Sequence, residues 1–134
     1  MKIRKLTKSD YETLEKWWKG FSWESAPRKD ILPENGTGGL MIEKEDKCVA
    51  AVFIYDTNSS LSWITWLVSD PDYKQRDKGL LIETLIKGAE QVSKNMGKKG
   101  MFAFGKTNSI VNIHKKLNWF IDENKPGKEM IKLI

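Results

Sequence analysis

The stretch from Leu61 to Met96 decides the fold, and it reads LSWITWLVSD (61–70), PDYKQRDKG (71–79) and LLIETLIKGAEQVSKNM (80–96). The first segment alternates aromatic and β-branched residues with period two, which is typical of a strand with both faces partly covered. In the last segment apolar residues recur every three or four positions and predict an amphipathic helix of about four turns. These residues are Leu81, Leu85, Ala89, Val92 and Met96. Gly97 is expected to end that helix.

The charged turn between strand and helix ends in Arg76-Asp77-Lys78-Gly79. A strand followed by a basic turn that opens a helix is a ready anion site, because free amides and the positive helix end point at one spot. Arg76, Lys78 and the amides of Gly79, Leu80 and Leu81 are therefore expected to bind a phosphate. A merely solvated turn is the alternative.

The region from Val68 to Leu85 resembles the signature of the GNAT superfamily of acyl-CoA N-acyltransferases. In that family a strand ending in Val is followed by a Pro-x-Tyr turn, the pyrophosphate loop Gln/Arg-x-x-Gly-x-Gly/Ala, and a helix. Here the loop is Arg76-Asp77-Lys78-Gly79-Leu80-Leu81, with Leu81 at the second small position and a turn about two residues longer than usual. The resemblance implies that all six loop residues lie against the diphosphate of acetyl-CoA.

Composition limits the other classes of protein to which this chain could belong. The 134 residues predict one domain, 1–134, and 40% hydrophobic residues with 6 Trp exclude a disordered chain. No apolar run approaches the ~20 residues of a membrane span, and the N-terminus does not resemble a secretion signal. The single cysteine, Cys48, fits a reduced cytoplasmic setting. The net charge of +5 suits a polyanionic partner, either nucleic acid or cofactor phosphates, or a solvated lysine-rich surface.

Periodicity and turn residues predict an α/β protein with a central mixed, twisted sheet of six to seven strands and helices on both faces. The expected strands are 2–6, 40–45, 48–56, 61–69, 101–105, 119–122 and 129–133, and the expected helices are 10–19, 80–96 and 109–117. The order β-α-loop-β-β-β-α-β-α-β-β is also that of the GNAT fold, so the resemblance covers nearly the whole chain. The loop, 21–39, is long and rich in Pro and Gly, which indicates a functional segment.

A second patch, NSIVNIHKKLNWF (108–120), resembles the late helix of the family, Asn-x-x-Ala-x-x-x-Tyr-x-Lys-x-Gly-Phe. Asn108 takes the Asn position, His114 the Tyr, Asn118 the Gly and Trp119 the Phe. The resemblance implies that Asn108 contacts the pantetheine arm and that His114 protonates the departing thiolate of CoA. As alternatives, Asn108 is a good helix cap in any protein, and His114 shares an apolar stripe typical of a buried structural histidine. The short chain most resembles compact GNAT proteins encoded by bacteriophages.

The same resemblance places the oxyanion contact on the backbone around Val68, with Leu67 and Ser69 as its neighbours. The attacking amine must lose a proton, and Glu24 in the long loop is the first candidate for that base, with an ordinary exposed carboxylate as the alternative. Trp23 is expected to line the acceptor pocket. The other tryptophans fall on apolar periods and are expected in the core; they are Trp17, Trp18, Trp63, Trp66 and Trp119. With a single histidine, a zinc site is not expected.

The sequence thus predicts a cytoplasmic, acetyl-CoA-dependent N-acetyltransferase without a metal, acting by direct attack in a ternary complex. Its acceptor, a small-molecule or protein amine, stays open, as does the choice between monomer and homodimer. A catalytically degenerate GNAT-fold protein that binds a partner protein is the first alternative. A basic nucleic-acid-binding module is the weaker one, because the lysines are scattered among acidic residues.

Overall fold

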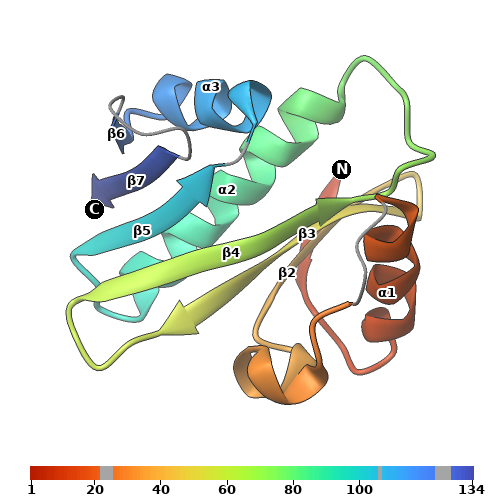
Figure 1. Ribbon diagram of the computed structural model, residues 1–134, viewed down its shortest axis with the longest axis horizontal. Helices are drawn as coiled ribbons and strands as arrows, with labels where there is room; N and C mark the ends of the chain where they lie inside the picture. The colour runs from red at the N-terminus through yellow and green to blue at the C-terminus, as the bar shows by residue number, and fades with distance from the viewer. Residues whose placement is uncertain (22–25, 106, 123–127) are drawn as a thin grey trace.

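One mixed sheet organises the computed structural model, which describes residues 1–21, 26–105, 107–122 and 128–134 (Figure 1). Within these residues seven strands lie in the order β1-β2-β3-β4-β5-β7-β6. The strands are β1 (Lys2–Lys5), β2 (Gly39–Lys44), β3 (Lys47–Asp56), β4 (Leu61–Ser69), β5 (Gly100–Gly105), β6 (Phe120–Ile121) and β7 (Lys128–Leu133). The helices are α1 (Asp10–Gly20), α2 (Lys78–Asn95) and α3 (Asn108–Lys116). The predicted fold class and element order are confirmed.

The antiparallel meander and the crossover both follow the sequence. β2 and β3 are joined by Glu45 and Asp46, whose φ angles of 51° and 65° are those of a type I′ hairpin turn. β4 pairs antiparallel with β3 and parallel with β5, and α2 makes the connection between β4 and β5. The long connection contains two short 3-10 turns, Lys29–Ile31 and Pro33–Gly36.

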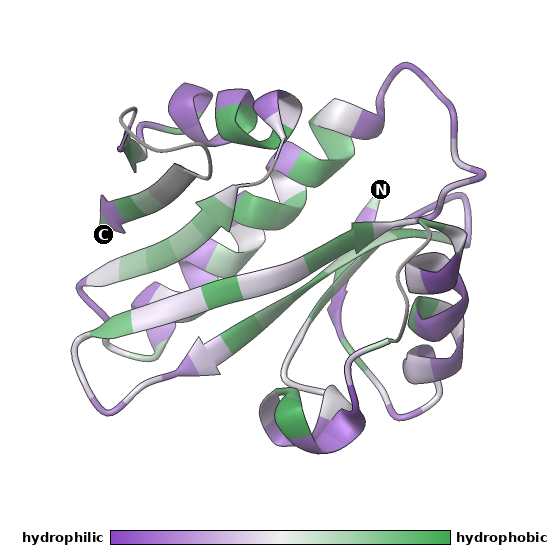
Figure 2. Ribbon diagram, viewed as in Figure 1, coloured by the Kyte–Doolittle hydropathy of each residue, from purple (hydrophilic) through white to green (hydrophobic). Residues whose placement is uncertain are grey.

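Helices cover the two faces of the sheet unequally. On one face α2 and α3 pack on β2 to β5, with Leu81, Leu85 and Ile86 fully buried. On the other face α1 packs through Trp17 and Trp18 over the β2–β4 part of the sheet. β3 contributes to both clusters, as its unbroken apolar run predicts, and Figure 2 shows this run as a green band through the sheet.

Helices α2 and α3 end at residues with left-handed backbone, Gly97 and Asn118. Gly97, with φ 80°, ends α2 as predicted, because the Gly97 amide donates to the Lys94 carbonyl and Lys98 donates to Ser93. Gly20 is different: it lies inside α1, and an added Cβ would come within 2.7 Å of the Pro71 side chain. Its role is close packing on the turn after β4 and not a left-handed stop.

Asn118 ends α3 in the left-handed region, with φ 67°. Its amide donates to the Lys115 carbonyl and the Trp119 amide donates to the His114 carbonyl, both at 3.0 Å, which is the bonding pattern of a Schellman motif. Asparagine therefore adopts the left-handed backbone at the position where the resemblance has a glycine.

This motif predicts opposite effects for two substitutions at Asn118. Asn118→Ala should lower the free energy of unfolding by about 1 kcal/mol, since a Cβ without asparagine's local hydrogen bonding disfavours left-handed backbone. Asn118→Gly should leave it unchanged or raise it by up to about 1 kcal/mol. Urea denaturation followed by circular dichroism measures both. Asn112→Ala, at an exposed position inside α3, is the matched control and should not destabilise. An equal loss of unfolding free energy in Asn118→Ala and Asn118→Gly would contradict this account.

Candidate functional site

The site begins where β4 and β5 part. The register pairs these strands at Leu61, Ser62 and Trp63 with Gly100, Met101 and Phe102, and no further pair follows among the described residues. Opposite β3 the register of β4 shifts between Thr65 and Val68, which is a β-bulge. Trp66 lies in this bulge with φ 57°, a conformation that a bulky residue rarely adopts. The bulge therefore bends β4 away from β5.

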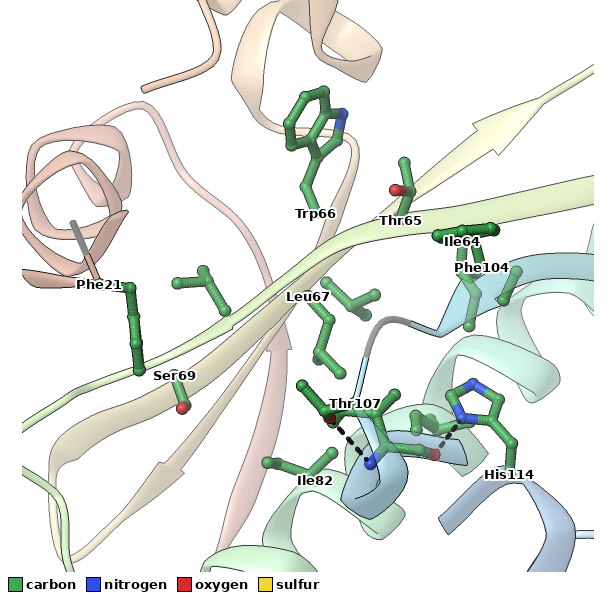
Figure 3. A pocket seen from close by; sticks show the side chains of 15 residues that line it. Phe21, Ile64, Thr65, Trp66, Leu67, Ser69, Ile82, Phe104, Thr107 and His114 are labelled. Carbon is green, nitrogen blue, oxygen red and sulfur yellow. Dashed lines mark hydrogen bonds between the residues drawn. The ribbon is translucent and has the colours of Figure 1, made fainter. Parts of the chain in front are cut away.

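A cavity of about 540 Å³ fills the space between the separated strands (Figure 3). Its walls come from β3, β4, β5, α2, α3 and the residue after α1. They are formed by Phe21, Val52, Ile64, Thr65, Trp66, Leu67, Val68, Ser69, Ile82, Ile86, Ala103, Phe104, Thr107, Ile110 and His114. A mostly apolar cavity with a few polar groups is typical of a small-molecule site.

The backbone of β4 turns one amide toward the side of the cavity. The Asp70 amide donates to the Val49 carbonyl of β3 at 2.8 Å, and strand amides alternate in direction. The amide of Val68 therefore points toward β3, with which Val68 is paired through Ala51. The amide of Ser69 points to the opposite edge, where β5 has already separated. It is thus better placed than the amide of Val68 to donate to a ligand in the cavity, and Leu67 lies in the bulge on the other side of Val68.

The N-terminus of α2 is held by side chains. Asp77 forms an ion pair with Lys44, at the end of β2, and accepts a hydrogen bond from the Tyr73 hydroxyl at 2.7 Å. The Lys44 ammonium, and after it the Tyr73 hydroxyl, hold the pKa of the Asp77 carboxyl below its ordinary value. A neutralised carboxylate at this end leaves the helix amides available to an anion. Arg76 is exposed beside it, and the Lys78 ammonium lies 6.0 Å from the centre of the Phe21 ring.

Gly79, Leu80 and Leu81, which follow, differ in how exposed they are. A Cβ at Gly79 would meet no atom within 4 Å, so the space beside its Cα is open. Leu80 is 53% exposed. Leu81, by contrast, is fully buried against the sheet, and its amide donates to the Asp77 carbonyl. Its large side chain is taken up by the core and does not line the cavity.

His114 lies against the cavity, 2% exposed. Its Nδ1 is 2.8 Å from the Ile110 carbonyl oxygen, which can only accept, so Nδ1 carries the proton. Nε2 has no hydrogen-bond partner among the described residues. The Trp119 ring packs edge-on against the imidazole at 4.8 Å. Burial lowers the pKa of His114, although the bond to Ile110 and the charge of Glu90 oppose this, so the ring is neutral at pH 7.

Thr107 is a residue that the sequence analysis missed. It is the N-cap of α3, its hydroxyl accepts from the Ile110 amide at 3.3 Å, and it lines the cavity. The predicted cap, Asn108, is instead the first residue of the helix and is exposed. The signal was present, because threonine followed by a helical period is a capping pattern.

Solved structures of other proteins share this architecture. Rv2747 from Mycobacterium tuberculosis, in complex with CoA, superposes with a TM-score of 0.74 at 12% identity, covering 100% of this chain and 99% of that one. Ard1 from Thermoplasma volcanium gives 0.77 at 13% identity, over 99% and 97%. The aminoglycoside 6'-N-acetyltransferase from Enterococcus faecium gives 0.74 at 14% identity, over 99% and 97%.

The chain has the GNAT fold. Neither a protein-family model nor the sequence of a curated protein matches it. At 12 to 14% identity the likeness establishes the fold, and the function must be argued from the cavity itself.

The structure places the predicted site residues in two groups. Leu67, Val68, Ser69 and His114 line the cavity, whereas Arg76 precedes α2, Asp77 is its N-cap and Lys78 to Leu81 form its first turn without lining the cavity. Trp23 and Glu24 lie outside the described residues, so their predicted roles stay predictions. Trp63 was expected in the core, and that was wrong: it is 44% exposed, because α1 does not cover its part of the sheet.

Two further properties concern the described part of the chain. No group of three or more His, Cys, Asp or Glu residues there is arranged to hold a metal ion. No helix among these residues has the length and apolar character needed to cross a membrane.

The geometry of His114 predicts its spectrum. As the sole histidine, it gives a single imidazole in ¹⁵N-labelled protein. We expect its pKa below the ordinary 6.5, with Nδ1 protonated and Nε2 unprotonated at pH 7, because burial disfavours the charged ring. Two-bond ¹H–¹⁵N correlation spectra over a pH series measure the pKa and the tautomer together. A proton on Nε2 at pH 7 would refute the assignment.

Proposed function

We propose that this protein is an N-acetyltransferase that moves the acetyl group of acetyl-CoA to a primary amine by direct attack. One observation carries the proposal: β4 and β5 separate around a cavity of about 540 Å³ that reaches the second turn of α2 at Ile82. A thioester in that cavity would have a strand amide beside it and a positive helix end next to it. The acetyl-CoA or CoA named in the structures of fold neighbours, Rv2747 among them, supports this choice of co-substrate.

The diphosphate would be held at the N-terminus of α2. The amides of Gly79 and Leu80 precede the first intrahelical bond, which Leu81 makes, and are therefore available to an anion. Arg76 and Lys78 add positive charge. Asp77 contributes through its ion pair with Lys44, which fixes the loop. The pantetheine arm would pass between β4 and α3, where Thr107 lines the cavity and Asn108 is the next residue.

Acetyl-CoA supplies an activated carbonyl carbon and a thiolate leaving group. The nitrogen of the amine forms a bond to that carbon, the C–S bond breaks, and one proton of the amine must finally reach the sulfur. The Ser69 amide is our candidate for stabilising the developing oxyanion. Glu24 is the candidate for accepting the proton that the ammonium form of the amine must lose before it attacks, which is a different proton from the one released on attack.

The resemblance implied that a protonated His114 donates a proton to the departing thiolate. The geometry of the ring favours instead a neutral His114 at the start of the reaction. A neutral ring with Nδ1 bonded to Ile110 leaves the lone pair of Nε2 without a partner, and His114 lines the cavity. We propose that Nε2 first accepts the proton from the attacking amine and then passes it to the thiolate. This sequence needs the neutral ring at the start, which burial provides.

Calorimetry with acetyl-CoA tests the binding step. We expect saturable binding by the wild-type protein and a loss of at least about 10-fold in affinity for Arg76→Glu, because a carboxylate replaces a cation beside the diphosphate. Lys94→Glu makes the same charge change in the last turn of α2 and should bind like the wild type.

The variant Gly79→Ala separates an effect on acetyl-CoA binding from an effect on the stability of the fold. The added Cβ meets nothing in the protein, so the fold should be as stable as before or slightly more stable. The same Cβ would crowd a diphosphate on the loop and weaken binding. Absence of binding at millimolar acetyl-CoA would end the enzymatic proposal in favour of a GNAT-fold protein that binds a partner.

The pH dependence of kcat/KM tests whether His114 first accepts or first donates a proton. We expect His114→Phe, which keeps a ring against Trp119, to lower kcat/KM by about 100-fold at pH 7.5. The ratio of wild-type to variant kcat/KM cancels the ionisation of the amine. If His114 must start neutral, this ratio falls as the pH drops through the lowered pKa of His114 and is constant above it. A ratio that rises toward acid pH would show that the protonated ring is the active form.

A further inference from the structure

A row of apolar side chains crosses the sheet on the face that α1 covers elsewhere. Across β3, β4, β5, β7 and β6 the register aligns Tyr55, Trp63, Phe102, Ile131 and Phe120. Directly paired residues point to the same face of a sheet, so these side chains share it. Phe104, two positions after Phe102 on β5, lies on this face as well.

This part of the face is uncovered in the described residues. Trp63 is 44% exposed and Phe104 is 47% exposed, although the tryptophans of α1 are buried. α1 packs toward the other end of β4, around Val68, and Figure 1 shows it standing away from β5 and β7. Large aromatic side chains exposed side by side are unusual on a monomer and mark a binding surface.

Trp63, Phe102 and Phe104 form what we call the aromatic shelf. The Trp63 and Phe102 rings meet edge to face, with centres 5.7 Å apart and planes at 76°. Tyr55 supports Trp63 from the other side, at 6.2 Å. The Tyr55 hydroxyl donates to the Ile31 carbonyl and accepts from the Trp66 indole. The shelf is therefore built of rings held in place before any ligand binds.

The shelf is continuous with the cavity. Phe104 belongs to both, and Thr65, two positions after Trp63 on β4, also lines the cavity. On the other side of the sheet the cavity is lined by Ile82 and His114. In Figure 3, Thr65 and Trp66 point away from β4 on the side opposite Leu67. The cavity thus passes through the sheet where β4 and β5 separate, and it opens beside the shelf.

The two ends of this passage suit different parts of the reaction. The α2 and α3 side has the helix N-terminus and His114, where acetyl-CoA is proposed to bind. The shelf side offers flat apolar rings, which bind an aromatic body by burial and edge-to-face contact and also attract an ammonium group. A polyamine or an aminoglycoside has little apolar area to bury there.

We propose that the acceptor is a primary amine carried by an aromatic ring, which lies on the aromatic shelf while the amino group enters the cavity beside Thr65. An arylalkylamine such as phenethylamine or tryptamine has this chemistry. The proposal rests on the proposed acetyltransferase function for the chemistry, but the binding of the ring depends only on the shelf.

The first experiment follows CoA release with phenethylamine, tryptamine, spermidine and kanamycin as acceptors. We expect kcat/KM for the two aromatic amines to exceed that for spermidine and kanamycin by at least about 10-fold. Trp63→Ala should raise KM for phenethylamine by about 10-fold while its affinity for acetyl-CoA stays that of the wild type. Phe120→Ala removes a more exposed ring at the outer strand β6 and serves as the matched control, with no change expected.

The second experiment separates this proposal from the proposed function. In ¹H–¹⁵N spectra the indole resonance of Trp63, identified by its loss in Trp63→Ala, should shift with phenethylamine and not with spermidine, in the absence of acetyl-CoA. If acetyl-CoA fails to bind while this shift appears, the enzymatic function falls and the aromatic amine site stands. If acetyl-CoA binds and spermidine or kanamycin is the better acceptor, or Trp63→Ala changes nothing, the aromatic acceptor is refuted.

Discussion

The end of pairing between β4 and β5 after Trp63 is the constraint on which the site depends. Two neighbouring parallel strands that stop bonding leave polar backbone groups exposed, which is costly unless water or a ligand satisfies them. The β-bulge enforces this separation. Trp66 is kept in left-handed backbone by the hydrogen bonds that link its indole to Tyr55 and Tyr55 to Ile31. Strain of this kind persists only where the surroundings hold it, and it is common at ligand sites.

Burial at the end of α3 keeps His114 neutral. The Schellman motif at the end of α3 folds Trp119 back onto the helix, and its ring closes one side of the imidazole. The carbonyl of Ile110, one turn earlier, binds Nδ1. With one nitrogen bonded inside its own helix, the ring can meet a ligand only through Nε2. A tyrosine, which the family has at this position, would offer a proton there, whereas this histidine offers a lone pair.

Local chemistry made most of the fold predictable. The β2–β3 hairpin, α2 with its stop at Gly97, and the left-handed Asn118 depend on residues close together in sequence. The bulge at Trp66 was not predictable, because alternation through 61–69 is unbroken in the sequence and the shift in register depends on β3. The exposure of Trp63 was missed for a related reason. An apolar period shows which face a residue occupies, and only the placement of α1 decides whether that face is covered.

Leu81 illustrates how one architecture accommodates a large residue where the family has a small one. Its side chain points into the core between α2 and the sheet, so its size affects the packing of the helix and not the shape of the loop. The loop is shaped instead by the contacts of Asp77 with Lys44 and Tyr73, which tie the start of α2 to the end of β2 and to the turn after β4. Because these contacts use side chains, the amides of Gly79 and Leu80 stay free. An anion site of this kind depends on backbone direction more than on the identity of the residues that provide it.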